Sequence, residues 1–138
     1  MPSSTAVWQG GLEFLINQDN HTITIDGSAE HGGHDQGPRP KNLLLTALIG
    51  CTGMDAVSIL KKMKVRDYEL TVKASADTTE KHPKIFRHIN VEFIFTGKDL
   101  PRDKIERAVS LSQEKYCGVS EMLRGKVELS YDIIMKNP

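Results

Sequence analysis

The alternation of apolar and polar positions along the chain predicts four regions of β-strand. Apolar side chains recur at every second position within residues 6–26, and again over residues 68–76, 86–95 and 127–135. This period is typical of strands that bury one face. Turn residues at 17–20 interrupt the first region, so residues 6–26 are expected to form strands joined by a hairpin.

Two helices are predicted between these strands. Residues 40–63 begin as a helix that is apolar on nearly all sides and become amphipathic toward the lysine-rich end. A second helix is expected over residues 101–116, and a short helical turn over residues 119–123. Small and apolar side chains mark the inward face of the second helix, namely Ile105, Ala108, Val109 and Ser112.

The resulting order, β-β-α-β-β-α-β with long antiparallel strands, predicts an α+β fold. The first helix is too apolar for one small sheet to cover. We therefore expect a homodimer in which these helices lie between sheets from both chains. A chain of 138 residues without repeats or a change in composition is expected to form a single domain over residues 1–138.

Composition and charge limit the classes of binding partner and the compartment that we expect for this protein. The 18 basic and 18 acidic residues cancel, so no net charge favours a nucleic acid or an anionic membrane. We expect no membrane-spanning segment, because no run of apolar residues approaches the roughly 18 to 20 that a span needs. The N-terminal residues lack the pattern of a secretory signal, which predicts a cytoplasmic protein. In that reducing compartment, cysteines are inert, bind metals or act as transient redox groups.

The Gly27–Arg39 loop separates the first strands from the first helix. It is rich in Gly, His and Pro and shows no periodicity, and loops of this length are often functional. His31 and His34 offer two imidazoles, but two ligands do not make a metal site. We therefore predict a flexible, solvated loop and no metal.

Cys51 lies within the first predicted helix and allows two interpretations. It is either a small hydrophobic core residue or a nucleophilic thiol, which requires a lowered pKa. It is too far from the helix N-terminus for the dipole to act on it, so a cation would have to approach from elsewhere. The candidate cations are Arg39, Lys41, Arg66, Arg87 and the loop histidines.

Asp55 lies four residues after Cys51, on the same helix face. A carboxylate in so apolar a helix needs a partner, and we expect a structural ion pair. The alternative is that Asp55 orients a cation at the thiol.

Cys117 follows the second helix and is either an unremarkable terminal thiol or a resolving cysteine for Cys51. Glu114 nearby is expected to be exposed, with a supporting role at the thiols as the alternative. No phosphate-binding loop or Ser-His-Asp pattern is present, and no cofactor is expected.

Two segments resemble the OsmC/Ohr family of osmotically inducible and organic hydroperoxide resistance proteins. Gly37–Leu60, which contains Gly50-Cys51-Thr52-Gly53-Met54-Asp55, is similar to the central helix of that family. Leu111–Ser120 resembles its second cysteine segment. Residues 82–86 and 95–100 are also similar to OsmC-like members. The resemblance is strong over residues 37–123 and extends to the whole chain in element order.

The resemblance implies a fold, an assembly and a reaction. The fold is an intertwined homodimer with two long central helices packed between antiparallel β-sheets. The reaction is the reduction of organic hydroperoxides in oxidative stress defence, with Cys51 as the reactive cysteine and Cys117 as the resolving one. An external dithiol reductant then restores both thiols.

The chain departs from the peroxidase members and resembles the divergent OsmC-like branch. Those members carry a glutamate just after the helix-opening proline, where this chain has Lys41. Their partner arginine falls roughly at Asp26 or Gly27. Arg39 or Lys41 is the remaining candidate for stabilising a thiolate. Two alternatives to the peroxidase therefore stay open: a non-catalytic stress protein that binds an apolar small molecule at the dimer interface, and a thiol redox sensor.

Overall fold

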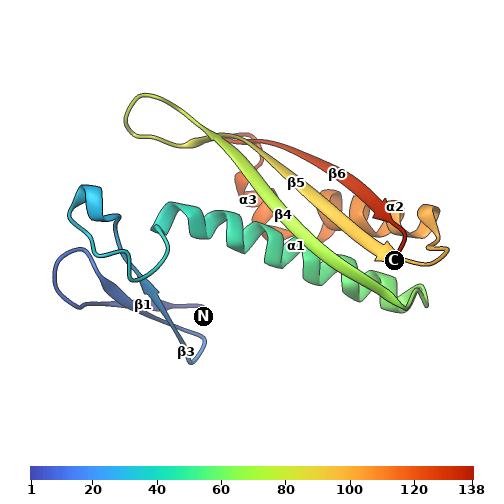
Figure 1. The fold of residues 1–138 in the computed structure, drawn as a ribbon, viewed down its shortest axis with the longest axis horizontal. Coiled ribbons are helices and arrows are strands. Elements are labelled where there is room, and N and C mark those ends of the chain that lie inside the picture. Colours follow the sequence, from blue (N-terminus) through green and yellow to red (C-terminus); the bar gives the residue numbers. More distant parts are fainter. The chain divides into compact units, whose positions relative to one another are not determined.

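The computed structural model describes residues 1–138 and confirms the α+β class (Figure 1). Its chain divides into two compact units, Met1–Leu44 and Leu45–Pro138. The second unit holds both cysteines and the larger core.

The first unit is built on a three-stranded antiparallel sheet. Strands β1 (Ser4–Trp8), β2 (Phe14–Gln18) and β3 (His21–Ile25) pair in chain order. The predicted hairpin is the β2–β3 pair, whose turn residues Asp19 and Asn20 have positive φ angles of 50° and 63°. Strand β1 completes the sheet on the other side of β2.

The loop after β3 is organised by Asp26, which the prediction of a flexible loop did not anticipate. The Asp26 carboxylate, in a residue only 2% exposed, accepts hydrogen bonds from the backbone N–H groups of Gly27, His34 and Gln36. Burial raises the pKa of Asp26, but the three donors together lower it by more than burial raises it. The net shift of this pKa is therefore downward. A Cβ atom on Gly33 would lie 2.1 Å from the carbonyl oxygen of Gly27, so the loop closes tightly there. Asp26, which falls where the resemblance would place an arginine, is therefore a loop-organising residue.

The first helix begins with a 3₁₀ turn (Pro40–Asn42) and continues as α1 (Leu43–Lys62). Its fully buried residues are spaced four apart and form one stripe: Leu48, Thr52, Ala56 and Leu60. The span Pro40–Lys62 is long and apolar enough to cross a membrane by length and composition, so the expectation that no segment qualifies was wrong. In this fold α1 is a core helix, because its buried stripe belongs to the hydrophobic core of the second unit.

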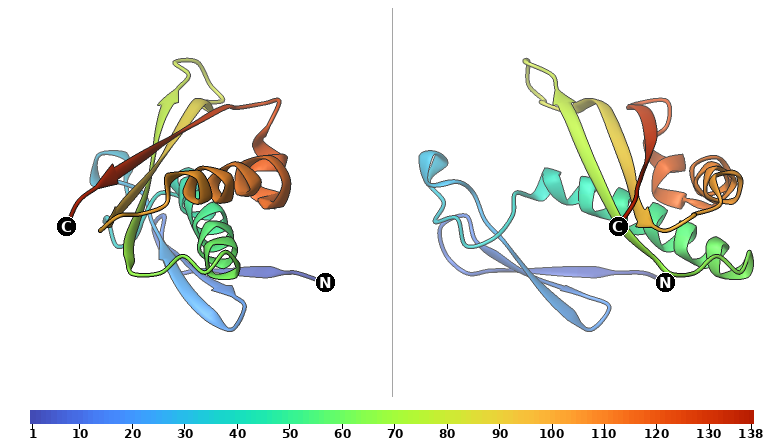
Figure 2. Two further views of the ribbon diagram at one scale, coloured as in Figure 1. Left: turned by 90° about the vertical axis from the view of Figure 1, so that its right-hand side faces the viewer. Right: turned by 45° about the vertical axis from the view of Figure 1, so that its right-hand side comes forward.

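The second unit places helices on one face of a three-stranded sheet (Figure 2). Strands β4 (Tyr68–Thr78) and β5 (Phe86–Gly97) are antiparallel, whereas β5 and β6 (Glu128–Lys136) are parallel. The expectation of purely antiparallel strands was therefore wrong for this pair. The connection from β5 to β6 runs through helices, and such a crossover returns the chain in the same direction. Alternate residues of β5, including Phe93 and Phe95, fill the core between the sheet and the helices.

The segment before Cys117 is not the continuous helix that was predicted. Helix α2 (Arg102–Leu111) gives way to η3 (Ser112–Tyr116), a π-helical turn, and α3 (Gly118–Leu123) follows. The backbone N–H of Cys117 donates to the carbonyl of Ser112 over 2.9 Å, which closes the wider turn. Arg124 donates from Nη2 to the carbonyl oxygen of Gln113 over 2.6 Å and so ties α3 back to η3.

Candidate functional site

The second unit brings together two sulfur atoms that lie 66 residues apart in sequence (117 − 51). Cys51 is half-buried near the middle of α1, and Cys117 is only 4% exposed at the junction of η3 and α3. Each sulfur and a carboxylate oxygen of Asp55 lie within 4.8 Å of the other two. We call Cys51, Asp55 and Cys117 the thiol–carboxylate cluster. Both cysteines are free thiols.

The start of α3 holds both sulfurs through backbone donors. Cys117 is the N-cap of this helix, and its sulfur accepts from the N–H of Ser120 over 3.3 Å. The N–H of Val119 donates to the sulfur of Cys51. Such donors favour a thiolate, so the turn that positions the sulfurs also provides a partial positive charge.

Other groups act on Cys51 in the opposite direction. Burial raises the pKa of Cys51, and so does its hydrogen bond with the Cys117 thiol. The Val119 N–H lowers this pKa, while the charge of Asp55 raises it again. The net effect is a pKa above the ordinary value of 9.0, and no cation acts on Cys51 in the second unit. The surroundings of Cys51 therefore favour the protonated thiol over the thiolate.

Asp55 has a hydroxyl partner in the second unit. The Ser112 hydroxyl lies 3.3 Å from Oδ2 of Asp55 and 3.2 Å from the carbonyl oxygen of Thr52, to both of which it is placed to donate. Three ion pairs, at Asp35, Glu106 and Glu121, involve other carboxylates. Ser112 was predicted on the inward face of its helix, but its contact with Asp55 gave no signal in the sequence.

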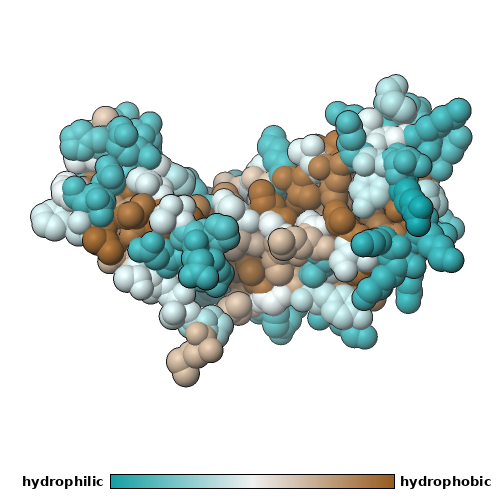
Figure 3. Space-filling model, turned by 90° about the horizontal axis from the view of Figure 1, so that it is seen from below, coloured by the Kyte–Doolittle hydropathy of each residue, from teal (hydrophilic) through white to brown (hydrophobic).

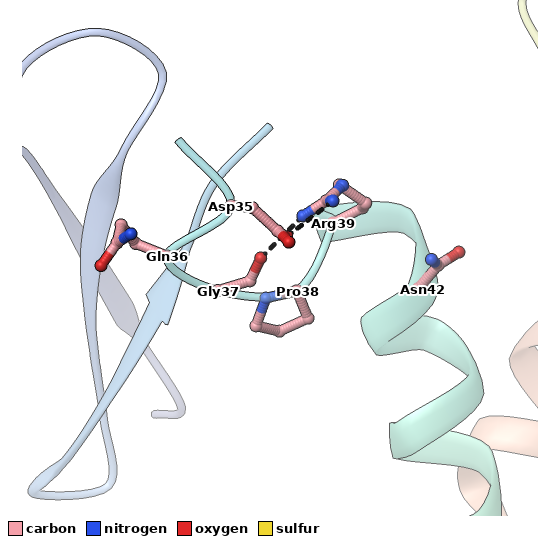
Figure 4. A pocket seen from close by; sticks show the side chains of 6 residues that line it. All are labelled: Asp35, Gln36, Gly37, Pro38, Arg39 and Asn42. Atoms are coloured by element: carbon pink, nitrogen blue, oxygen red, sulfur yellow. Dashed lines mark hydrogen bonds and ion pairs between the residues drawn. The ribbon is translucent and has the colours of Figure 1, made fainter. Parts of the chain in front are cut away.

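Arg39 and Lys41, the candidate cations, belong to the first unit. Arg39 pairs with Asp35 over 2.8 Å and donates from Nη1 to the carbonyl oxygen of Gly37 over 2.8 Å (Figure 4). Arg39 lies in a shallow hollow of about 470 Å³. The hollow is lined by Asp35, Gln36, Gly37, Pro38, Arg39 and Asn42. Glu114 is exposed on η3 and lies outside the thiol–carboxylate cluster. Of the two supporting candidates in the second unit, Asp55 lies next to the sulfurs and Glu114 does not.

An apolar groove runs between α1 and β4. It has a volume of about 570 Å³, and apolar side chains gather over this helix in Figure 3. Met54 at the groove is 77% exposed and Val57 is 45% exposed. Patches of this kind on a soluble protein mark sites of interaction. The groove is lined by Ile49, Gly50, Gly53, Met54, Val57, Ser58, Lys61, Leu70 and Val72.

Comparisons with known proteins give one consistent family. The sequence profile described as "OsmC-like protein" matches residues 33–132. The chain is similar to Protein YhfA of Escherichia coli strain K12, with 39% identity over 130 residues that cover 92% of this chain and 94% of YhfA.

Solved structures share the fold. A hypothetical protein from Aquifex aeolicus VF5 is similar with a TM-score of 0.87 and 28% identity, covering 100% of this chain and 98% of that one. The organic hydroperoxide resistance protein OhrB of Bacillus subtilis has a TM-score of 0.65 and 22% identity, covering 96% of this chain and 97% of its own. These findings confirm the resemblance seen in the sequence. The chain belongs to the OsmC-like protein family.

Proposed function

We propose that this protein is a thiol-dependent peroxidase that reduces organic hydroperoxides in oxidative stress defence. The observation that carries the proposal is the cluster geometry: the two sulfurs lie within 4.8 Å of each other and are linked by a thiol–thiol hydrogen bond. A resolving thiol must reach the sulfenic acid of its partner, and here only a small movement is needed. The name of OhrB adds support, since that protein is described as an organic hydroperoxide resistance protein.

The proposed reaction has three balanced steps. The Cys51 thiolate attacks the terminal oxygen of the hydroperoxide and the O–O bond breaks, so that Cys51 becomes a sulfenic acid. The departing alkoxide takes up a proton from solvent and leaves as the alcohol. The Cys117 thiol then attacks this sulfur, which forms the disulfide and releases water. A dithiol reductant exchanges with the disulfide, becomes oxidised itself and restores both thiols.

The exposure of the two sulfurs supports their proposed roles. Cys51 is half-buried and can meet a substrate, whereas Cys117 is 4% exposed and caps α3. The Val119 N–H stabilises the Cys51 thiolate, but burial, Cys117 and Asp55 outweigh it. Because the thiolate is the attacking form, we expect oxidation that is slow at neutral pH and accelerates as the pH rises.

We further propose that a second copy of the chain covers the apolar groove of α1, giving an intertwined homodimer in which the two units act as one domain. The exposed Met54 and Val57 support this assembly, because a soluble helix with an exposed apolar face requires a partner. A cytoplasmic location fits a cycle that depends on a dithiol reductant. The same groove supports the second candidate function, binding of an apolar small molecule without catalysis.

The test is thiol titration of the reduced protein before and after one equivalent of cumene hydroperoxide, with intact mass. We expect both thiols to disappear and the mass to fall by about two hydrogens. Cys117→Ser should stop at a sulfenic acid that dimedone traps, and Cys51→Ser should keep its remaining thiol. Unchanged thiols in the wild type would refute the peroxidase and favour the ligand-binding alternative. Oxidation without repeated turnover in the presence of excess dithiol would favour the redox sensor.

A further inference from the structure

The thiol–carboxylate cluster combines three donor atoms of a kind that metals bind. Each of the three donor atoms lies within 4.8 Å of the others. Two thiolates and a carboxylate oxygen on one tetrahedral zinc ion lie about 3.6 to 3.8 Å apart, given the usual Zn–S and Zn–O bond lengths. The cluster therefore needs shifts of about 1 Å at most, which side-chain rotations supply.

We propose that Cys51, Asp55 and Cys117 bind a zinc ion in the reduced protein, with a water molecule as the fourth ligand. Zinc suits this donor set, because thiolates exclude the hard cations and the carboxylate disfavours Cu(I). Cys51 and Asp55 are half-buried, so the site is open on one side for the water. The expectation of no metal considered only local spacing, which does not detect donors that lie 66 residues apart (117 − 51).

The surroundings of the cluster resemble those of a built metal site. The Ser112 hydroxyl, fully buried, lies 3.3 Å from Oδ2 of Asp55 and orients the carboxylate. Backbone N–H groups of Val119 and Ser120 point at the sulfurs. Outer partners of this kind hold metal ligands in position and tune their affinity.

The charges of the cluster also favour a cation. The Asp55 carboxylate lies beside both sulfurs, and its partner in the second unit is the neutral hydroxyl of Ser112. Binding of Zn²⁺ releases the thiol protons and places two positive charges among three anionic donors. When zinc occupies the site, neither sulfur is available to a hydroperoxide until the ion dissociates.

The experiment is an anaerobic titration of the reduced full chain with Zn²⁺ against a chromophoric chelator, repeated with Co²⁺ as a spectroscopic substitute. We expect one ion per chain and a Co²⁺ spectrum with thiolate charge-transfer bands and tetrahedral intensity. Cys51→Ser and Cys117→Ser should each abolish binding at micromolar metal. Asp55→Asn should weaken binding at least about tenfold. Glu69→Gln removes an exposed carboxylate on β4 and should leave the affinity unchanged.

The wild-type chain with its disulfide formed is a further control, because it has the same sequence and should bind no zinc. Circular dichroism of each variant shows whether it is folded. Absence of binding by the folded, reduced wild type would overturn the proposal, and so would an affinity that Asp55→Asn leaves unchanged. The zinc site does not depend on the peroxidase: zinc binding by a chain whose thiols ignore hydroperoxide refutes the proposed function alone, and disulfide formation without zinc binding refutes the site alone.

Discussion

Replacing Asp55 by Asn is expected to accelerate the oxidation of Cys51 at neutral pH. The negative charge of Asp55 raises the pKa of Cys51, together with burial and the Cys117 thiol, and the substitution removes only the charge. Asn keeps an oxygen that accepts from the Ser112 hydroxyl. More of Cys51 is then present as the thiolate, which is the nucleophile.

The size of the effect follows from the cluster distance. Two unit charges 4.8 Å apart interact by about 0.9 kcal/mol in water and about 3.5 kcal/mol at an effective dielectric constant of 20. Both side chains are half-buried, so solvent screens the pair and the lower end applies. An energy of about 0.9 kcal/mol is about fourfold in the thiolate population, and therefore in the rate of oxidation below the pKa.

The assay is the second-order rate constant of single-turnover oxidation, measured for both proteins from about pH 6 to about pH 10. An electrostatic effect disappears at high pH, where both proteins are thiolates, whereas a change in structure persists there. Glu69→Gln, which removes an exposed carboxylate, should match the wild type throughout. A rate that falls at every pH after Asp55→Asn would refute the reasoning and would show that Asp55 assists the attack.

Three further predictions concern stability. Asp26→Ala leaves three backbone donors without their acceptor and should lower the urea midpoint more than Asp35→Ala, whose carboxylate makes only an exposed ion pair; equal effects would contradict this. Ser112→Ala should cost about 1 to 2 kcal/mol of unfolding free energy, because a buried hydrogen bond is lost, and its neighbour Ser110→Ala should cost less. Because the pKa of Cys51 is raised in the folded chain, the unfolded chain releases the Cys51 proton at a lower pH than the folded chain does. The free energy of unfolding should therefore fall as the pH rises above 9.0. Cys51→Ser should remove this part of the decline in urea melts at successive pH values, leaving that of Tyr68, whose pKa burial also raises.

The fold was predictable where one face of an element is buried. Strands β4 and β5 alternate because the core takes every second side chain, and the predicted ranges of β4, β5 and β6 agree with the structure to within two residues. Strand β1 is exposed along its whole length, so its first residues carried no such signal. The parallel pairing of β5 with β6 was not predictable from alternation, which is the same in both directions.

The site was predictable as a pair of cysteines but not as a set of contacts. The two cysteine motifs, read in order, placed Cys51 and Cys117 in one site. Their surroundings depend on the π-helical turn, because it sets where Ser112 and the N–H groups of Val119 and Ser120 lie. A sequence does not reveal a one-residue widening of a helix, so the contact of Ser112 with Asp55 was not predictable.

The Asp55 charge links the two proposals in opposite directions. The carboxylate whose charge adds to burial and Cys117 in raising the pKa of Cys51, and so slows its proposed reaction with hydroperoxide, is also the third ligand of the proposed zinc site. Asp55→Asn should therefore raise the oxidation rate of the metal-free protein and lower its affinity for zinc. A purely structural role for Asp55 would impair both properties together. Measured on one preparation, these two quantities decide whether the cluster is an electrostatically tuned site or only a packed pair of thiols.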